Sequence, residues 1–190
     1  MATKNILPPI SLAERKDYTA RVRSWNEAHT AETGRTRKCF VLTFGCQQNE
    51  ADSEKIAGMA EEMGYEITST PEEADLIMVN TCAIRDHAEK RVFGMLGALT
   101  HSKKANPNQI ICLCGCMAQR SEVAEKVRKS YRHVDLVFGP QAMWKFPELL
   151  HQVYTRRGRV FSVEDEHGHI AEGMPVVRES GVKAWVSIMY

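Results

Sequence analysis

Short apolar runs alternate with amphipathic helical patterns through the middle of the chain. Four of these runs are apolar over nearly their whole length and rich in β-branched residues, which is typical of strands that are buried on both faces. They are "KCFVLTFG" from Lys38, "ADLIMVNTC" from Ala74, "QIICLCG" from Gln109 and "VDLVFG" from Val134. The segment "YEIT", from Tyr65, is a shorter candidate strand.

Helical patterns fill the intervals between the runs. After the first run, apolar residues recur at helical spacing, Asn49 is the expected N-cap, and Gly64 is the expected end of the helix. The members of this stripe are Ile56, Met59, Ala60 and Met63. Further helices are expected over 84–104 and 121–130, and a last one from about Pro147 to Tyr154.

This alternation of buried strands and helices predicts the fold. Parallel strands need helical crossovers, which cover both faces of the sheet. We therefore expect a doubly wound α/β domain with a parallel sheet over 37–154, in a Rossmann-like or flavodoxin-like arrangement of three layers.

The segments outside this domain are less regular. Residues 1–36 are polar, and we expect a loose N-terminal extension with at most a short helix around Leu12 to Ala28. Residues 155–182 are expected to form a linker with one possible edge strand. Residues 183–190 read as a buried-type strand with nothing after it, which predicts that the sequence continues in a longer protein.

Composition and charge narrow the possible functions. Of 190 residues, 43% are hydrophobic and 26% are charged, an ordinary globular balance. The net charge of +1 is not the basic footprint of a domain that holds nucleic acid on its own. No apolar run is long enough to span a bilayer, and the first residues lack the apolar core of a signal peptide. We expect a cytoplasmic monomer without a membrane partner.

Three of the six cysteines occupy equivalent places in the predicted fold. Cys46, Cys82 and Cys116 each follow a predicted strand and precede a predicted helix. The carboxyl ends of parallel strands share one edge of the sheet, where α/β proteins bind ligands, so these thiols should converge. Helix N-termini favour thiolates, and Gly45 and Gly115 permit close backbone approach. Three thiolates suit zinc or an iron–sulfur cluster rather than disulfides.

The other three cysteines are interpreted differently. Cys112 and Cys114 alternate within a predicted strand, so they share one face and are expected in the buried core. Cys39 opens the first strand, at the opposite edge of the sheet. Arg85 and Arg120 are expected to add positive charge near the three converging thiols.

Two further features carry weaker hypotheses. His87 is a candidate fourth ligand. However, it is expected about one turn into a helix, where a histidine is more often exposed or capping the helix. The "RRGR" stretch at 156–159 is interpreted as a solvated turn, with contact to RNA phosphates in a larger complex as the alternative.

Three stretches resemble the N-terminal domain of the radical-SAM methylthiotransferases: "TFGCQQNEADSEKIAG", "NTCAIRDHAEKRVFGMLG" and "GCMAQR". The similarity covers about 38–190. The second stretch is most similar to the branch that makes 2-methylthio-N6-isopentenyladenosine next to the tRNA anticodon. The segment "VKAWVSIMY" is similar to the strand that leads into the family's central barrel. The barrel's CxxxCxxC motif and the C-terminal RNA-binding domain do not occur in this sequence.

The resemblance implies a role for the three converging thiols. Cys46, Cys82 and Cys116 would bind an auxiliary 4Fe–4S cluster that holds and presents sulfur. A second 4Fe–4S cluster and S-adenosylmethionine would belong to the barrel of the same chain. The tRNA would be bound mainly by other domains, a sulfur donor would be a further partner, and the fragment alone is expected to be inactive.

Two alternatives stay open. The first is a structural zinc domain, although such sites are usually closed by four ligands and only three are evident. The second is a sibling methylthiotransferase that acts on threonylcarbamoyladenosine in tRNA or on a ribosomal protein.

Overall fold

The computed structural model describes residues 12–83, 86–163, 173–178 and 184–185. Within this part of the chain, six parallel strands form one sheet in the order β2-β1-β3-β4-β5-β6. The strands are β1 (Lys38–Phe44), β2 (Glu66–Ile67), β3 (Leu76–Thr81), β4 (Ile110–Gly115), β5 (Leu136–Phe138) and β6 (Val160–Ser162). The first five fall in the four apolar runs and in "YEIT", as the sequence predicts.

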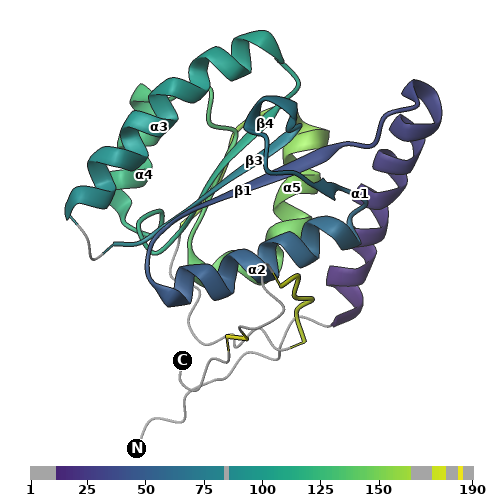
Figure 1. The fold of residues 1–190 in the computed structure, drawn as a ribbon, viewed down its shortest axis with the longest axis horizontal. Helices are drawn as coiled ribbons and strands as arrows, with labels where there is room; N and C mark the ends of the chain where they lie inside the picture. Colours follow the sequence, from purple (N-terminus) through teal and green to yellow (C-terminus); the bar gives the residue numbers. More distant parts are fainter. Residues whose placement is uncertain (1–11, 84–85, 164–172, 179–183, 186–190) are drawn as a thin grey trace, which may run out of the picture.

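Helices cover both faces of this sheet. They are α1 (Leu12–Thr33), α2 (Gln47–Glu62), α3 (Asp86–Ala105), α4 (Ser121–Ser130) and α5 (Phe146–Arg156), with 3-10 turns at Pro71–Glu73 and Pro140–Lys145. The helices α2 and α5 pack on one face, and α3 and α4 pack on the other (Figure 1). Each face has its own core of buried apolar side chains. The predicted doubly wound α/β fold is confirmed.

The strand order locates a crevice. From β1 the chain adds β2 on one side and β3 on the other. The helices that leave β1 and β3, namely α2 and α3, therefore lie on opposite faces of the sheet (Figure 1). In open α/β sheets, ligands bind outside the carboxyl ends of the strands at such a reversal. A ligand is therefore expected to bind at the carboxyl ends of β1 and β3.

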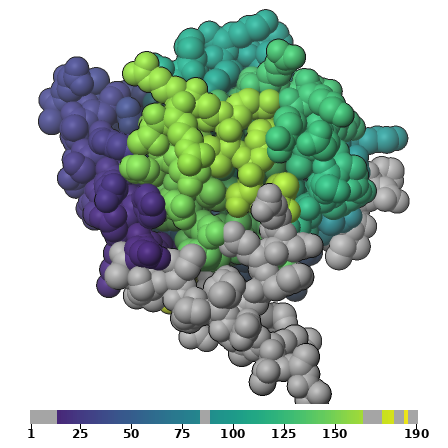
Figure 2. Space-filling view, turned by 180° about the vertical axis from the view of Figure 1, so that it is seen from behind, coloured from purple at the N-terminus to yellow at the C-terminus, as the bar shows by residue number. Residues whose placement is uncertain are grey.

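The helix α1 departs from the loose extension that the sequence predicts. It runs over 22 residues and packs beside α5 (Figure 2). Val22 is fully buried, and the ring of Trp25 stacks on His151 with 4.8 Å between centroids. The rest of the helix is polar, without the continuous apolar stripe that identifies a packed helix in a sequence. A few side chains therefore anchor α1 to the domain. The domain boundary that the sequence predicts after residue 36 stays a prediction.

Charged side chains organise the amino edge of the sheet. Asp75 accepts a hydrogen bond from the Lys38 amide at 2.8 Å, and Asp135 accepts one from the Ile111 amide at 2.9 Å. The Arg159 guanidinium donates to backbone carbonyls at and beyond the end of α4, which belong to Val127, Arg128, Tyr131 and Val134. The interpretation of "RRGR" as a solvated turn is therefore wrong for Arg159, which closes the C-terminus of α4.

Residues 173–178, here called the crossing segment, run over α2. The Val177 amide donates to the Glu54 carbonyl at 3.0 Å. A Cβ atom on Gly58 would lie 2.6 Å from the carbonyl carbon of Pro175, so a side chain at this position would push the two backbones apart. No helix in the described ranges combines the length and the apolar character that a membrane span requires.

Candidate functional site

The strand register aligns the three turns that carry the predicted ligands. Phe44 of β1 pairs with Thr81 of β3, and Thr81 pairs with Gly115 of β4. Cys46, Cys82 and Cys116 follow these aligned positions by one or two residues. Two backbone hydrogen bonds tie the turns together. They run from the Cys82 amide to the Phe44 carbonyl at 2.9 Å and from the Met117 amide to the Thr81 carbonyl at 3.3 Å. All three turns lie at the carboxyl edge, at and next to the crevice.

Cys46 is the N-cap of α2, where the sequence predicted Asn49. The helix begins one turn earlier because Asn49, at its third position, reaches back to the cap. The Asn49 Oδ1 atom accepts from the Cys46 amide at 3.2 Å and from the Cys46 thiol at 3.4 Å. A Cβ atom on Gly45 would lie 2.2 Å from the same oxygen, so glycine there makes room for the cap.

Cys82 and Cys116 lie in turns of different character. Cys82 is buried directly after β3, whereas Cys116 is half-buried after Gly115. Gly115 has φ of +92°, a left-handed conformation that favours glycine, and a Cβ atom there would lie 2.4 Å from the Thr81 carbonyl oxygen. The glycine therefore lets β4 turn closely against β3 before Cys116.

The electrostatics at Cys116 differ from the prediction. The helix α4 begins only at Ser121, so the N-terminal helix charge expected to favour its thiolate is several residues away. Burial raises the pKa of the Cys116 thiol, and negative charge at Cys82, Asp52 and Cys46 raises it further. The Cys116 thiol is therefore close enough to Cys82, Asp52 and Cys46 for negative charge on them to act on it.

The donor chemistry at this edge is that of soft thiolates, which zinc and iron–sulfur clusters both take as ligands. Within the described residues, no group of three His, Cys, Asp or Glu side chains is found that could hold one metal ion. The thiolates of a cluster each bind a different iron atom, so a cluster does not require its ligands to converge on one point. The three cysteines therefore fit such a group by their chemistry and by their shared edge.

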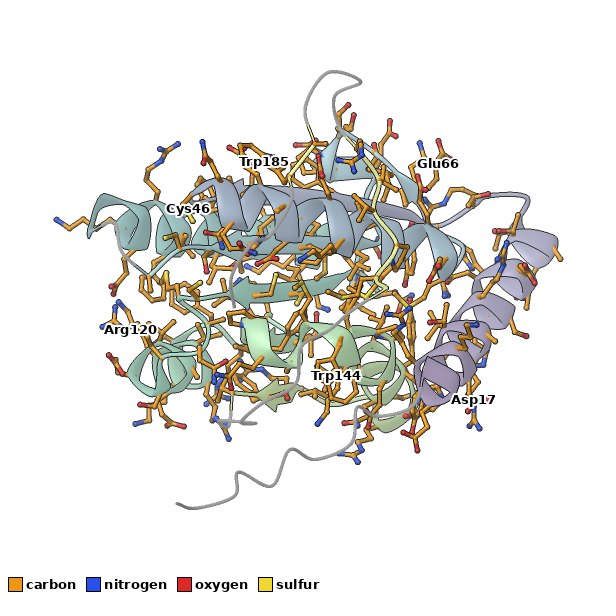
Figure 3. All side chains as sticks on the ribbon, turned by 90° about the horizontal axis from the view of Figure 1, so that it is seen from below. Asp17, Cys46, Glu66, Arg120, Trp144 and Trp185 are labelled. Atoms are coloured by element: carbon orange, nitrogen blue, oxygen red, sulfur yellow. The ribbon has the colours of Figure 1, made fainter. Side chains whose placement is uncertain are left out.

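The other three cysteines of the sequence do not join this edge. Cys39, Cys112 and Cys114 are fully buried in the core on the face covered by α2 and α5, which confirms the core interpretation of Cys112 and Cys114. Arg120 lies toward the same end of the molecule as Cys46, opposite Glu66 (Figure 3). Its guanidinium is paired with carboxylates, those of Glu89 at 3.5 Å and Glu122 at 2.7 Å. The side chains of Arg85 and His87 lie outside the described residues.

Sequence reasoning missed the polar side chains that lie beneath the three turns. Asn80 is buried near the end of β3, bonded to Asn49 and to Ser53. Asp52 is buried on α2, where burial raises its pKa although Lys55 and Gln48 partly oppose that shift. The available signal was Asn80 itself, a polar residue at the end of an otherwise apolar run.

Comparisons with known proteins agree with the resemblance. The chain matches the model of the uncharacterized protein family UPF0004 over residues 38–139, a range that includes all six cysteines. A tRNA-2-methylthio-N(6)-dimethylallyladenosine synthase from Acetivibrio thermocellus is 44% identical over 188 residues, which are 98% of this chain and 39% of the relative. The synthase of the same name from Clostridioides difficile shows the same identity and coverage.

A third relative shows a similar identity over a shorter part of the chain. The protein of this name from Geobacillus kaustophilus is 46% identical over 157 residues, which are 83% of this chain and 30% of the relative. The chain thus spans between 30% and 39% of the length of these three relatives. The family match covers more than half of the chain, and the identity extends over nearly all of it. The chain therefore belongs to the UPF0004 family, and it shares this region with proteins that are named tRNA-2-methylthio-N(6)-dimethylallyladenosine synthase.

Proposed function

We propose that the protein acts in a radical-SAM methylthiotransferase that converts N6-isopentenyladenosine next to the tRNA anticodon into its 2-methylthio form. In this proposal, Cys46, Cys82 and Cys116 bind an auxiliary 4Fe–4S cluster. The observation that carries it is the register of Phe44, Thr81 and Gly115, which supports one shared edge for the three cysteines. The names of the relatives support the substrate.

The chain's own residues would have three tasks. The thiolates of Cys46, Cys82 and Cys116 would supply three ligands and leave one of four irons without a protein ligand. When bound, the cluster would hold a sulfur atom at that iron and present it for transfer. Gly115 would hold the Cys116 turn close against β3, and the buried side chains under the edge would keep water from reaching the cluster from the sheet side.

Other parts of the proposal concern the whole protein. We expect a second 4Fe–4S cluster and S-adenosylmethionine in a barrel domain of the same chain, with tRNA bound mainly through other domains. A sulfur donor would be a further partner. The proposed location is the cytoplasm and the proposed state is a monomer. The small net charge supports a domain that leaves most RNA binding to others.

Anaerobic reconstitution with iron and sulfide tests the proposal. The expected product has the broad visible absorption and, after reduction, the EPR spectrum of a 4Fe–4S cluster. Pulsed EPR with isotopically labelled methanethiolate should then show hyperfine coupling to the label. Absence of coupling, with four protein ligands on the irons, would leave an electron-transfer or structural cluster.

Two other outcomes are recognisable in the same experiments. A colourless protein with one tightly bound zinc would favour the structural zinc domain. A cluster-bearing protein whose full-length form modifies threonylcarbamoyladenosine in tRNA or a ribosomal protein would keep the cluster site and change the substrate.

A further inference from the structure

A pair of buried amide side chains lies directly beneath the three cysteine turns, and the proposed function assigns it no role beyond the exclusion of water. Asn49, on the first turn of α2, is fully buried, and Asn80, near the end of β3, is 1% exposed. The Asn49 Nδ2 atom donates to Asn80 Oδ1 at 3.1 Å. In return, Asn80 Nδ2 donates to the Asn49 carbonyl at 2.8 Å. The two side chains join a helix to a strand by reciprocal hydrogen bonds.

Each of the three turns contacts this pair. Asn49 Oδ1 accepts from the amide and thiol of Cys46. Asn49 Nδ2 also donates to the carbonyl of Thr81, the residue before Cys82, at 3.2 Å. Asn80 Oδ1 lies against Gly115, the residue before Cys116, since a Cβ atom there would be 2.4 Å away. The amide pair therefore contacts one residue at or beside every predicted ligand.

The pair is fully hydrogen-bonded. The remaining hydrogen bond of Asn80 Nδ2 goes to Ser53 Oγ at 2.9 Å, and that hydroxyl is in turn bonded to Thr43 Oγ1 at 2.7 Å. Simple filling of the core would be served by an apolar residue, as at the first four positions of β3. A complete network of buried amides instead defines one relative placement of the groups that it joins.

We infer that Asn49 and Asn80 are positioning residues, which hold the turns of Cys46, Cys82 and Cys116 in the arrangement that a cluster needs. This inference rests on the proposed function. Neither amide has to contact the cluster. Residues that orient metal ligands from behind commonly change metal affinity by about 10- to 100-fold when they are replaced.

The chain offers a matched control at a distance from the cysteines. Asn26 of α1 is also 1% exposed, and its side chain also bridges two elements. Its Nδ2 atom donates to the Met63 carbonyl at 2.8 Å, and its Oδ1 atom accepts from Arg37 at 2.9 Å. Asn26→Ala should therefore destabilise the fold in the same way as the edge variants, without touching a cysteine turn.

The experiment compares Asn49→Ala, Asn80→Ala and Asn26→Ala in protein reconstituted anaerobically with iron and sulfide. The first readout is the rate of iron loss to a chelator, which should rise about 10- to 100-fold in the two edge variants and stay at the wild-type rate in Asn26→Ala. The second readout is the EPR spectrum of the reduced cluster, which should broaden only in the edge variants. Urea unfolding of each apo-protein reports the shared loss of stability.

The outcomes separate this inference from the proposed function. If wild-type protein takes up no cluster, or Cys46→Ala keeps it, the proposed function fails. If wild-type protein holds the cluster but both edge variants lose iron no faster than Asn26→Ala, the positioning role is overturned. Should Asn80→Ala not fold, Ser53→Ala removes only the hydroxyl that binds Asn80. A smaller acceleration in the same direction would then support the inference, and a wild-type rate would overturn it.

Discussion

Two regions of one sheet each hold three cysteines, and they differ in almost every physical respect. In the interior, Cys39, Cys112 and Cys114 lie within strands, fully buried among apolar side chains. At the carboxyl edge, the other three lie in turns, with glycine, buried amides and a carboxylate around them. Only Gly115 lies between Cys114 and Cys116 in the sequence. A cysteine is therefore a core residue or a candidate ligand according to its position before or after the end of the strand, not according to the local composition.

The interior thiols are also chemically quiet. Burial raises the pKa of the Cys39 thiol, and burial together with a hydrogen bond that the Cys112 thiol donates to Cys114 raises the pKa of the Cys112 thiol. A thiol that keeps its proton is a poor nucleophile and a poor metal ligand. The comparison teaches that a strand interior surrounds cysteine with apolar side chains, whereas a strand end places it beside polar side chains and backbone groups.

The largest expected difference between the regions is in iron content. Cys116→Ala should sharply reduce the iron and sulfide bound after anaerobic reconstitution, and Cys46→Ala and Cys82→Ala should do the same. Cys114→Ala should leave both near the wild-type amounts. Chemical analysis of iron and sulfide per chain checks this. If Cys114→Ala abolished the cluster while Cys116→Ala spared it, the roles of the two regions would be reversed.

A second difference concerns the backbone that ends β4. Gly115→Ala should lower the free energy of unfolding by about 3 kcal/mol, because the new Cβ atom meets the β3 backbone at a left-handed φ. Gly94→Ala is the matched change in α3, where nothing lies within 4 Å. It should raise stability by about 0.5–1 kcal/mol, since alanine favours helix. Urea unfolding measures both, and equal effects would show that the edge turn is not constrained.

The third difference is in pH dependence. Folding raises the pKa of the Cys39 and Cys112 thiols. Below the pKa of a thiol in the unfolded chain, about 8.5, these thiols are therefore protonated in the folded and in the unfolded protein alike. Above it, only the unfolded chain releases the protons, so stability is lost as pH rises, by up to about 1.4 kcal/mol per pH unit and thiol. Urea unfolding between about pH 7 and 9.5 should show this fall. Cys112→Val should reduce the slope, and an unchanged slope would contradict the assignment.

The smallest expected difference is in the stability of the apo-protein, where the interior cysteine should matter more than the edge cysteine. Cys112→Ala should cost about 1 kcal/mol of stability in the apo-protein, because it leaves a small cavity in a packed core. Cys116→Ala, at a half-buried turn, should cost less than about 0.5 kcal/mol. Thermal or urea unfolding of the two apo-variants compares them. A larger loss at Cys116 would indicate a structural role for that thiol.

The sequence predicted the fold well where apolar runs were continuous. Strands β1, β3, β4 and β5 and the bounds of α4 follow from pattern alone, because strands that helices cover on both faces are apolar over most of their length. The same reasoning failed for α1, whose docking depends on Val22, Trp25 and a few polar contacts that leave no periodic signal. Tertiary contact, not helical pattern, determines that helix.

The candidate site was predictable in part. The placement of Cys46, Cys82 and Cys116 after strands follows from the sequence, whereas their service as ligands stays a prediction. The start of α2 was misplaced because Asn49 was expected to cap the helix, while it reaches back from the third position. Its bonds to Asn80 join residues 31 positions apart, and no local pattern reports such a contact.

Because Gly58 lies close to Pro175, α2 connects the cysteine edge of the sheet to the crossing segment. The helix begins at the cap formed by Cys46 and meets the crossing segment about twelve residues later, roughly 18 Å along its axis at 1.5 Å per residue. A helix of this length is stiff, so it acts as a spacer of fixed length between the sulfur edge and the crossing segment. The crossing segment is therefore held at a set distance from Cys46 along α2.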